Sequence, residues 1–160
     1  MRYDPIEGPT LSTLTPEENA VLRAEHDQVT NGQVGGSHYQ NLPIQPRQFA
    51  MQNRWDSDSF SIVKYLTRYP DKAGVEDVKK GRHFAILRKE WAPRPIPFQA
   101  GDIAMLSYVH QNELSPMVGN ALLMLDQWVR RGAIDTMEKC FAERTIQRID
   151  IILDWLESNS

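Results

Sequence analysis

Three basic residues in the middle of the chain have a spacing that suits phosphate binding. Lys64, Arg68 and Lys72 follow one another at intervals of four residues, and side chains four apart lie on the same face of a helix. Arginine can bind a phosphate through two parallel hydrogen bonds, while lysine acts as a mobile point charge. The pattern predicts a phosphate clamp in which Arg68 is exposed, so that its replacement would weaken ligand binding and barely change folding.

The alternative for these cations is a solvated basic face. They would then pair with nearby acids such as Asp71 and Glu76, and each exposed ion pair contributes only about 0–1 kcal/mol. The charge of the surrounding segment favours the clamp. Residues 60–94 hold nine Lys and Arg against four Asp and Glu, a local charge of +5 (9 − 4) in a chain whose formal net charge is −3. A local excess of this kind usually has an anionic partner.

A second group of candidate residues follows a glycine pair. Gly35-Gly36 can expose backbone N–H groups as an anion-binding nest next to Ser37. His38 could donate to a phosphate or act as an acid or base, and Tyr39 could stack on a nucleobase. The alternative is a structural corner in which His38 and Tyr39 cap a helix end.

Two further side chains lie close in sequence to the basic positions. Tyr65 stands between Lys64 and Arg68, which makes it a candidate for stacking on a base. His83 comes one helical turn after Lys80, and a histidine in such a place is more often a partly buried structural residue than a ligand contact.

These residues carry a resemblance to a known family. The motif residues are Gly35-Gly36-Ser37-His38-Tyr39, Ile44-Gln45-Pro46, Lys64-Tyr65, Arg68, Lys72, Val75-Glu76-Asp77-Val78-Lys79-Lys80 and His83-Phe84. In this order they resemble a small family of tailed-phage proteins whose best-understood members are nucleotide kinases acting on deoxynucleoside monophosphates. The chain departs from the family at Ser59-Phe60-Ser61, where an acidic residue and Gly-Asn are usual, and at Gly81, where alanine is usual.

The resemblance implies a set of site residues and partners. His38, Lys64 and Arg68 would be catalytic, and the substrate or phosphate would be bound by Ser37, Tyr39, Tyr65, Lys72, Asp77, Lys80 and His83. A nucleoside triphosphate would donate the phosphoryl group. Magnesium would accompany that donor, although the sequence offers no identifiable site for it. The expected place of action is the host cytoplasm.

Several other activities have no support in the sequence. There is no G-x-x-x-x-G-K-[ST] motif, so a kinase of this sequence would not use a P-loop. The histidines and Cys140 show no zinc-ligand spacing. Asp150 and Asp154 share a helical face, as in the carboxylate clusters of helical nucleotide pyrophosphohydrolases, but the doubled acidic pattern is incomplete and a solvated face is the simpler interpretation. A sequence pI of about 5.8 argues against a nucleic-acid-binding protein.

The elements that position these residues are expected to be helices only. Thr15-Pro16 begins a short helix to about residue 26, and further helices are expected near 46–53, 57–69, 75–91, 102–112, 116–131 and 134–156. The chain thus predicts an all-α fold of six to seven helices in two packed halves. Its parts are a tail and short helix at 1–30, a phage nucleotide-kinase-like helical domain at 31–92, a Pro-rich linker at 93–100 and a C-terminal helical half at 101–160.

The two halves echo each other when the second is aligned on the first without gaps. On this alignment Gln52-Asn53 falls on Gln111-Asn112, Leu66 on Leu125 and Tyr69 on Trp128. Leu123 and Gln127 occupy the places of Lys64 and Arg68. If the halves arose by a degenerate internal duplication, the second half would contribute to the hydrophobic core and not to the functional site. The alternative is that two helical units share such spacing by chance.

Composition and cysteine content limit where the protein is expected to act and what it is expected to bind. No stretch approaches the roughly 18 apolar residues that a transmembrane helix needs, and no secretory signal is expected, so no membrane partner is predicted. The single cysteine agrees with a reducing compartment. We expect a homo-oligomer, because the apolar stripe of the last helix offers an interface. Alternatives to a kinase are a non-catalytic protein that sequesters a nucleotide or signalling nucleotide, and a structural or assembly protein of a phage.

Overall fold

The computed structural model describes residues 15–18, 20–21, 24, 39–131 and 135–160, with the backbone alone for 135–140. The chain divides into two compact units, Met1–Gln40 and Asn41–Ser160. In the first unit, the N–H of Thr15 donates to Glu18 Oε2 at 2.8 Å and the N–H of Glu18 donates to Thr15 Oγ1 at 3.2 Å. This reciprocal pair is a capping box, and it confirms the helix start expected at Thr15.

Every secondary-structure element in the described part of the second unit is a helix, and this part contains no strand. Its elements are α2 (Pro46–Gln52), α3 (Ser57–Arg68), the 3-10 helix η2 (Tyr69–Asp71), α4 (Val75–Trp91), α5 (Met105–Gln111), α6 (Pro116–Arg131) and α7 (Asp135–Ser158). The all-α prediction is confirmed. None of the helices in the described ranges combines the length and the apolar character that crossing a membrane requires.

Most of the sequence signals that begin and end these helices act as expected, but α5 begins at Met105 and not at the predicted residue 102. Asp56 caps α3, because its carboxylate accepts a hydrogen bond from the N–H of Ser59 at 2.8 Å. Ser115 caps α6 in the same way, by accepting from the N–H of Val118 at 3.4 Å. The C-terminal end of α4 is fixed by Ala92, whose φ of 42° is left-handed, and by the proline that follows it.

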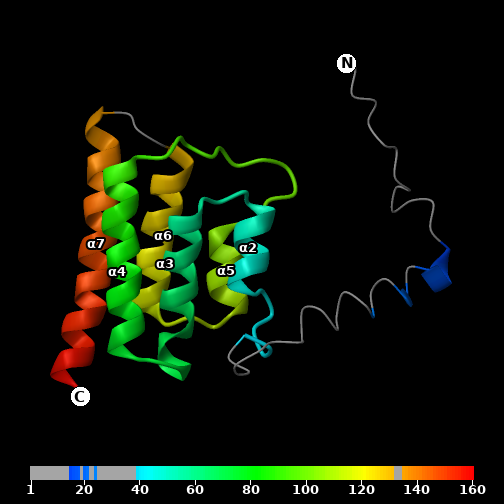
Figure 1. Ribbon diagram of the computed structural model, residues 1–160, viewed down its shortest axis with the longest axis horizontal. Helices are drawn as coiled ribbons and strands as arrows, with labels where there is room; N and C mark the ends of the chain where they lie inside the picture. The colour runs from blue at the N-terminus through cyan, green and yellow to red at the C-terminus, as the bar shows by residue number, and fades with distance from the viewer. Residues whose placement is uncertain (1–14, 19, 22–23, 25–38, 132–134) are drawn as a thin grey trace. The chain divides into compact units, whose positions relative to one another are not determined.

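The four long helices form a bundle. In Figure 1, α3, α4, α6 and α7 lie alongside one another, and the shorter α2 and α5 stand together at the opposite side from α7. Contacts run from α3 to α4, from α4 to α7, from α7 to α6 and from α6 back to α3. The core between them is mainly apolar: Ile62, Leu66, Leu122, Leu125 and Ile149 are each no more than 1% exposed.

Two features of this core bear on positions singled out in the sequence. Gly81 is buried where α4 packs against α3, and a Cβ at this position would lie 3.4 Å from Leu66 Cδ2, which is ordinary van der Waals contact. In α7, Ile149 and Ile152 are fully buried within the unit. This part of the stripe therefore packs inside the unit and offers no interface for the predicted oligomer.

Residues that correspond in the ungapped alignment of the two halves also share their backbone geometry. Asn53 and Asn112 end α2 and α5 with nearly identical backbone angles, φ −87° and ψ 0° against φ −86° and ψ 3°. The next residue in each half, Arg54 or Glu113, has a positive φ of 58° or 51°. A left-handed non-glycine residue at the same place in both halves is an uncommon coincidence.

The two asparagines also exchange equivalent contacts between the halves. The Asn53 amide donates to the carbonyl of Ile103 and accepts from its N–H, both at 2.9 Å. The Asn112 amide does the same to Ile44, which aligns with Ile103, at 2.8 and 3.0 Å. Two-fold-related subunits make reciprocal contacts of this kind. The halves thus match in geometry, while their origin by duplication stays a prediction.

The Pro-rich linker is bound to the helical bundle. The N–H of Ile96 donates to the carbonyl of Val129 at 2.9 Å, and Arg130 Nη1 donates to the carbonyl of Ile96 at 3.2 Å. Further along, the N–H of Gln99 donates to Asp102 at 2.9 Å. The segment connects the two halves as an extended strap attached to the end of α6.

Candidate functional site

Cations from α3 and α4 gather around the ring of Tyr65. Lys64 Nζ lies 4.5 Å from the ring centroid, Arg68 Cζ 4.7 Å and Lys80 Nζ 5.9 Å. The other side of the arrangement is apolar, because Tyr65 stacks on Phe84 with centroids 5.8 Å apart and an interplanar angle of 18°. We call Lys64, Tyr65, Arg68, Asp77, Lys80 and Phe84 the Tyr65 cluster. It unites predicted site residues from two helices on one surface.

The acid in this cluster is buried and holds the arginine. Asp77 lies in the first turn of α4 and its side chain is 0% exposed. Arg68 donates to it twice, from Nε at 2.8 Å and from Nη2 at 3.0 Å. Lys80 Nζ is 3.9 Å from the same carboxylate. The helix N-terminus adds a favourable dipole to a negative charge at this place.

This geometry corrects the expectation for Arg68. Its side chain is only 14% exposed, so it is not an exposed clamp, and the fork of its guanidinium is directed at Asp77. Arg68 is better described as a positioning residue that ties α3 to α4. The three cations and one carboxylate of the cluster leave a local charge of +2 (3 − 1), with Lys64 half-buried and Lys80 51% exposed.

Most of the remaining basic excess of residues 60–94 is complemented by α7. Lys79 pairs with Glu157 at 3.7 Å, Lys89 with Glu143 at 3.5 Å, and Arg82 donates to Asp150. The hydrogen bond to Asp150 raises the pKa of the Arg82 guanidinium. The acids of α7 therefore neutralise one side of α4, and the Tyr65 cluster lies on another.

Two of the predicted site residues in the second unit, Lys72 and His83, are not part of the cluster. Lys72 is exposed in the turn between η2 and α4 and has no ion pair among the described residues. His83 is exposed and reaches the cluster only through an edge contact with Phe84 at 6.0 Å. Tyr39 lies in a turn of the first unit. Ser37 and His38 lie outside the described residues.

A buried arginine was missed in the sequence. The side chain of Arg88 is 0% exposed; its Nε donates to Ser59 Oγ at 2.7 Å, and its guanidinium lies 4.3 Å from the Trp128 ring centroid. The signal was available, because Arg88 follows Gly81 and Ala85 on the stripe of α4 that faces the core. A charged residue on an apolar stripe marks a buried polar contact.

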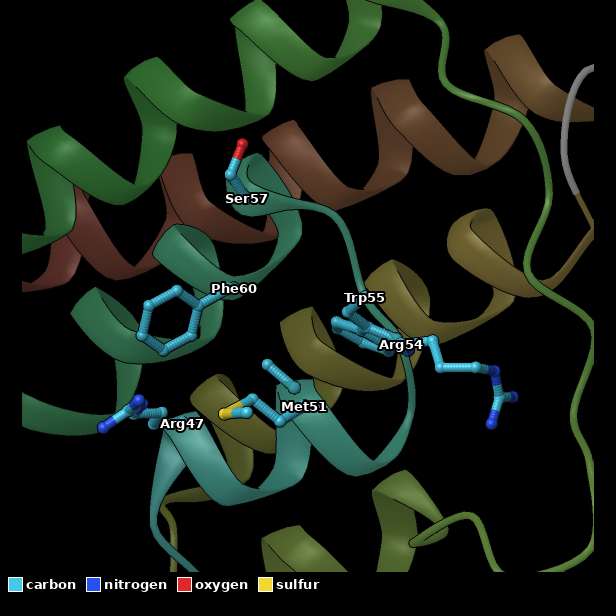
Figure 2. A pocket seen from close by; sticks show the side chains of 7 residues that line it. Arg47, Met51, Arg54, Trp55, Ser57 and Phe60 are labelled. Atoms are coloured by element: carbon cyan, nitrogen blue, oxygen red, sulfur yellow. The ribbon is translucent and has the colours of Figure 1, made fainter. Parts of the chain in front are cut away.

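A pocket between α2 and α3 was also missed. It has a volume of about 380 Å³ and is lined by Arg47, Ala50, Met51, Arg54, Trp55, Ser57 and Phe60 (Figure 2). None of the lining residues had been predicted to belong to a site. Sequence spacing gave no signal, because the pocket depends on how two short segments approach each other.

The described residues offer few ligands for a metal ion. In the described part of the chain no group of three or more His, Cys, Asp and Glu is placed to hold a metal ion. Magnesium binds nucleotides mainly through phosphate oxygens and few protein ligands, so a nucleotide could carry its own ion to the cluster. The cations around Tyr65 can bind an anion.

Comparisons with protein-family models, with curated protein sequences and with solved structures return no match. The family resemblance therefore rests on the motif residues alone.

Proposed function

We propose that the protein binds a nucleoside phosphate at the Tyr65 cluster. The observation that supports this is the convergence of Lys64, Arg68 and Lys80 on one aromatic ring. Ammonium groups bind phosphate oxygens as point charges, and the net positive charge of the cluster favours an anionic ligand. The buried Asp77 keeps Arg68 in place and lowers the net charge of the cluster without removing it.

The reaction class comes from the family resemblance. Transfer of a phosphoryl group to a deoxynucleoside monophosphate needs mainly positioning and positive charge, which Lys64 and Lys80 would supply, with His38 as the expected acid or base. On this proposal the protein is a P-loop-independent phage nucleotide kinase of the host cytoplasm. A protein that only sequesters a nucleotide would use the same cations and no acid or base.

Binding is tested by calorimetry at low salt with deoxynucleoside mono- and triphosphates. Loss of a charge-assisted hydrogen bond costs about 1.5–3 kcal/mol, so Lys64→Ala and Lys80→Ala should each weaken binding by about tenfold or more. Lys89→Ala is the matched control, because it removes the same charge from a pair on the other side of α4. An equal loss in the control would mean that binding is nonspecific, and no binding to the parent protein would refute the proposal.

Catalysis is tested in the same preparation with a deoxynucleoside monophosphate, ATP and Mg²⁺, followed by chromatography of the products. Formation of a deoxynucleoside diphosphate supports the kinase. Binding without product supports the sequestering protein, and absence of both is the result expected of a structural phage protein.

A further inference from the structure

The pocket between α2 and α3 has an apolar floor and a basic end. Ala50, Met51, Trp55 and Phe60 provide apolar and aromatic surface. Figure 2 shows Arg47 and Phe60 at one end and Arg54 at the other, with the guanidinium of Arg54 directed away from Met51. Arg54 is bound to Asp102 by two hydrogen bonds of 2.9 and 3.0 Å. Arg47 has no ion pair within the described ranges, so it is the arginine that can meet a ligand.

This chemistry suits a nucleobase. Aromatic rings and the polarisable thioether of methionine make favourable contacts with a flat π-system, and bases stack on aromatic side chains without requiring a particular sequence. A volume of about 380 Å³ lies within the range of small-molecule pockets.

One residue, Phe60, links the pocket to the Tyr65 cluster. Phe60 lines the pocket, and Lys64 Nζ lies 5.4 Å from the centroid of its ring. The same ammonium is 4.5 Å from the Tyr65 centroid. A ligand seated on Phe60 therefore has a cation of the cluster at the edge of its binding surface, with Arg47 at the same end of the pocket.

The matching place in the second half is closed. In the ungapped alignment of the halves, Ala50 corresponds to Val109 and Phe60 to Gly119. Val109 Cγ1 lies only 2.9 Å from the point that a Cβ on Gly119 would occupy, so α5 is packed tightly against α6 there. The open space between α2 and α3 belongs to the half that carries the cations.

We propose that this pocket is the base subsite of the nucleotide site: the base of a nucleoside phosphate lies against Met51, Trp55 and Phe60, and its phosphates extend towards Arg47 and Lys64. The inference rests on the proposed function and adds to it, because it assigns the nucleoside to residues outside the Tyr65 cluster.

The experiment compares dATP with inorganic tripolyphosphate, which has the same phosphate chain and no nucleoside. In the parent protein dATP should bind about fivefold tighter or more, as expected for stacking one base. Met51→Trp fills the pocket at a side chain that is 67% exposed, and Phe60→Leu keeps apolar volume while removing the aromatic face. Both variants should lose the preference for dATP and keep the affinity for tripolyphosphate.

The control is His110→Trp, because His110 is the exposed residue of α5 that corresponds to Met51; it should leave both affinities unchanged. A preference for dATP that survives in both pocket variants would overturn the base subsite while leaving phosphate binding intact. Equal binding of dATP and tripolyphosphate to the parent protein would overturn it too. If neither compound binds the parent protein, the proposed function itself fails and the subsite fails with it.

Discussion

At the scale of single residues, the Arg68–Asp77 ion pair determines which cations of the candidate site are exposed to a ligand. The pair is almost completely shielded from solvent and joined by two short hydrogen bonds. A charge removed from such a pair leaves its partner buried and poorly compensated, whereas replacing both partners with apolar residues is often close to neutral. The pair should therefore affect folding and ligand binding in separable ways.

Arg68→Ala should lower the free energy of unfolding by about 3–5 kcal/mol, because it leaves the Asp77 carboxylate buried with only Lys80 near it. The double variant Arg68→Met with Asp77→Leu should recover most of that loss and still bind nucleotide less tightly. Urea unfolding measures the first effect and calorimetry the second. A stable Arg68→Ala variant would mean that the carboxylate is solvated and that the pair does not fix α3 to α4.

The sequence predicted the members of the cluster better than their roles. Spacing along a helix places Lys64, Tyr65 and Arg68 on neighbouring surface, and the structure brings these three together, whereas Lys72 lies outside the cluster. Burial of Arg68 depends on Asp77, which comes from the next helix, α4. A contact between helices of this kind leaves no signature in the spacing of one helix, so the sequence could not distinguish an exposed clamp from a buried ion pair.

At the scale of elements, Asp102 joins three segments of the second unit. Its carboxylate accepts from Arg54 after α2, from the N–H of Gln99 in the linker, and from Arg130 Nη1 of α6 at 3.1 Å. The hydrogen bonds from Arg54 are the main reason that the pKa of Asp102 is lowered, and the charges of Arg54 and Arg130 act in the same direction. Burial of the carboxyl group acts in the opposite direction and raises its pKa.

This shift predicts a dependence of stability on pH. Because the pKa of Asp102 is lower in the folded than in the unfolded chain, its contribution is present above the unfolded value of about 4 and is lost as the pH falls through the folded pKa. Asp102→Asn should therefore be less stable than the parent near neutral pH and should lose less stability on acidification. Urea unfolding from about pH 6 to about pH 3 measures both.

Arg54→Gln should change the pH profile in the same way, because it removes the hydrogen bonds that lower the pKa. Burial raises the pKa of Asp126, and the charge of Asp102 adds to that shift, which acts in the opposite sense. Arg54→Gln keeps Asp102, so it retains this contribution of Asp126. Profiles that run parallel in all three proteins would contradict the assignment to Asp102.

Helix boundaries followed from the sequence more closely than the connections did. Proline, glycine and capping residues act within one turn, so α2, α4 and α6 begin at or within one residue of the predicted positions. The linker shows the limit of such signals. Its three prolines predict an extended chain, while its attachment to α6 through Ile96 depends on the carbonyl of Val129, which is remote in the sequence.

At the scale of the whole molecule, the two halves hold each other through equivalent asparagines. Asn53→Ala and Asn112→Ala each remove two hydrogen bonds. Each change thereby takes the side-chain partner from one backbone N–H and one backbone C=O of the other half. Each should lower the free energy of unfolding by about 2 kcal/mol, and by similar amounts. Gln48→Ala, an exposed change on α2, is the control for unfolding in urea. A large effect at one asparagine and none at the other would show that the halves are not equivalent in energy.

The strap that connects the halves has a consequence for how the protein behaves on dilution. A pair of separate chains held by two asparagine contacts and an apolar interface would come apart below its dissociation constant. Joining the partners in one chain makes their association intramolecular, with an effective concentration set by the strap and not by the number of copies present. The four-helix bundle, and with it the spacing of α3 and α4 beneath the Tyr65 cluster, is therefore retained even when very few molecules have been synthesised.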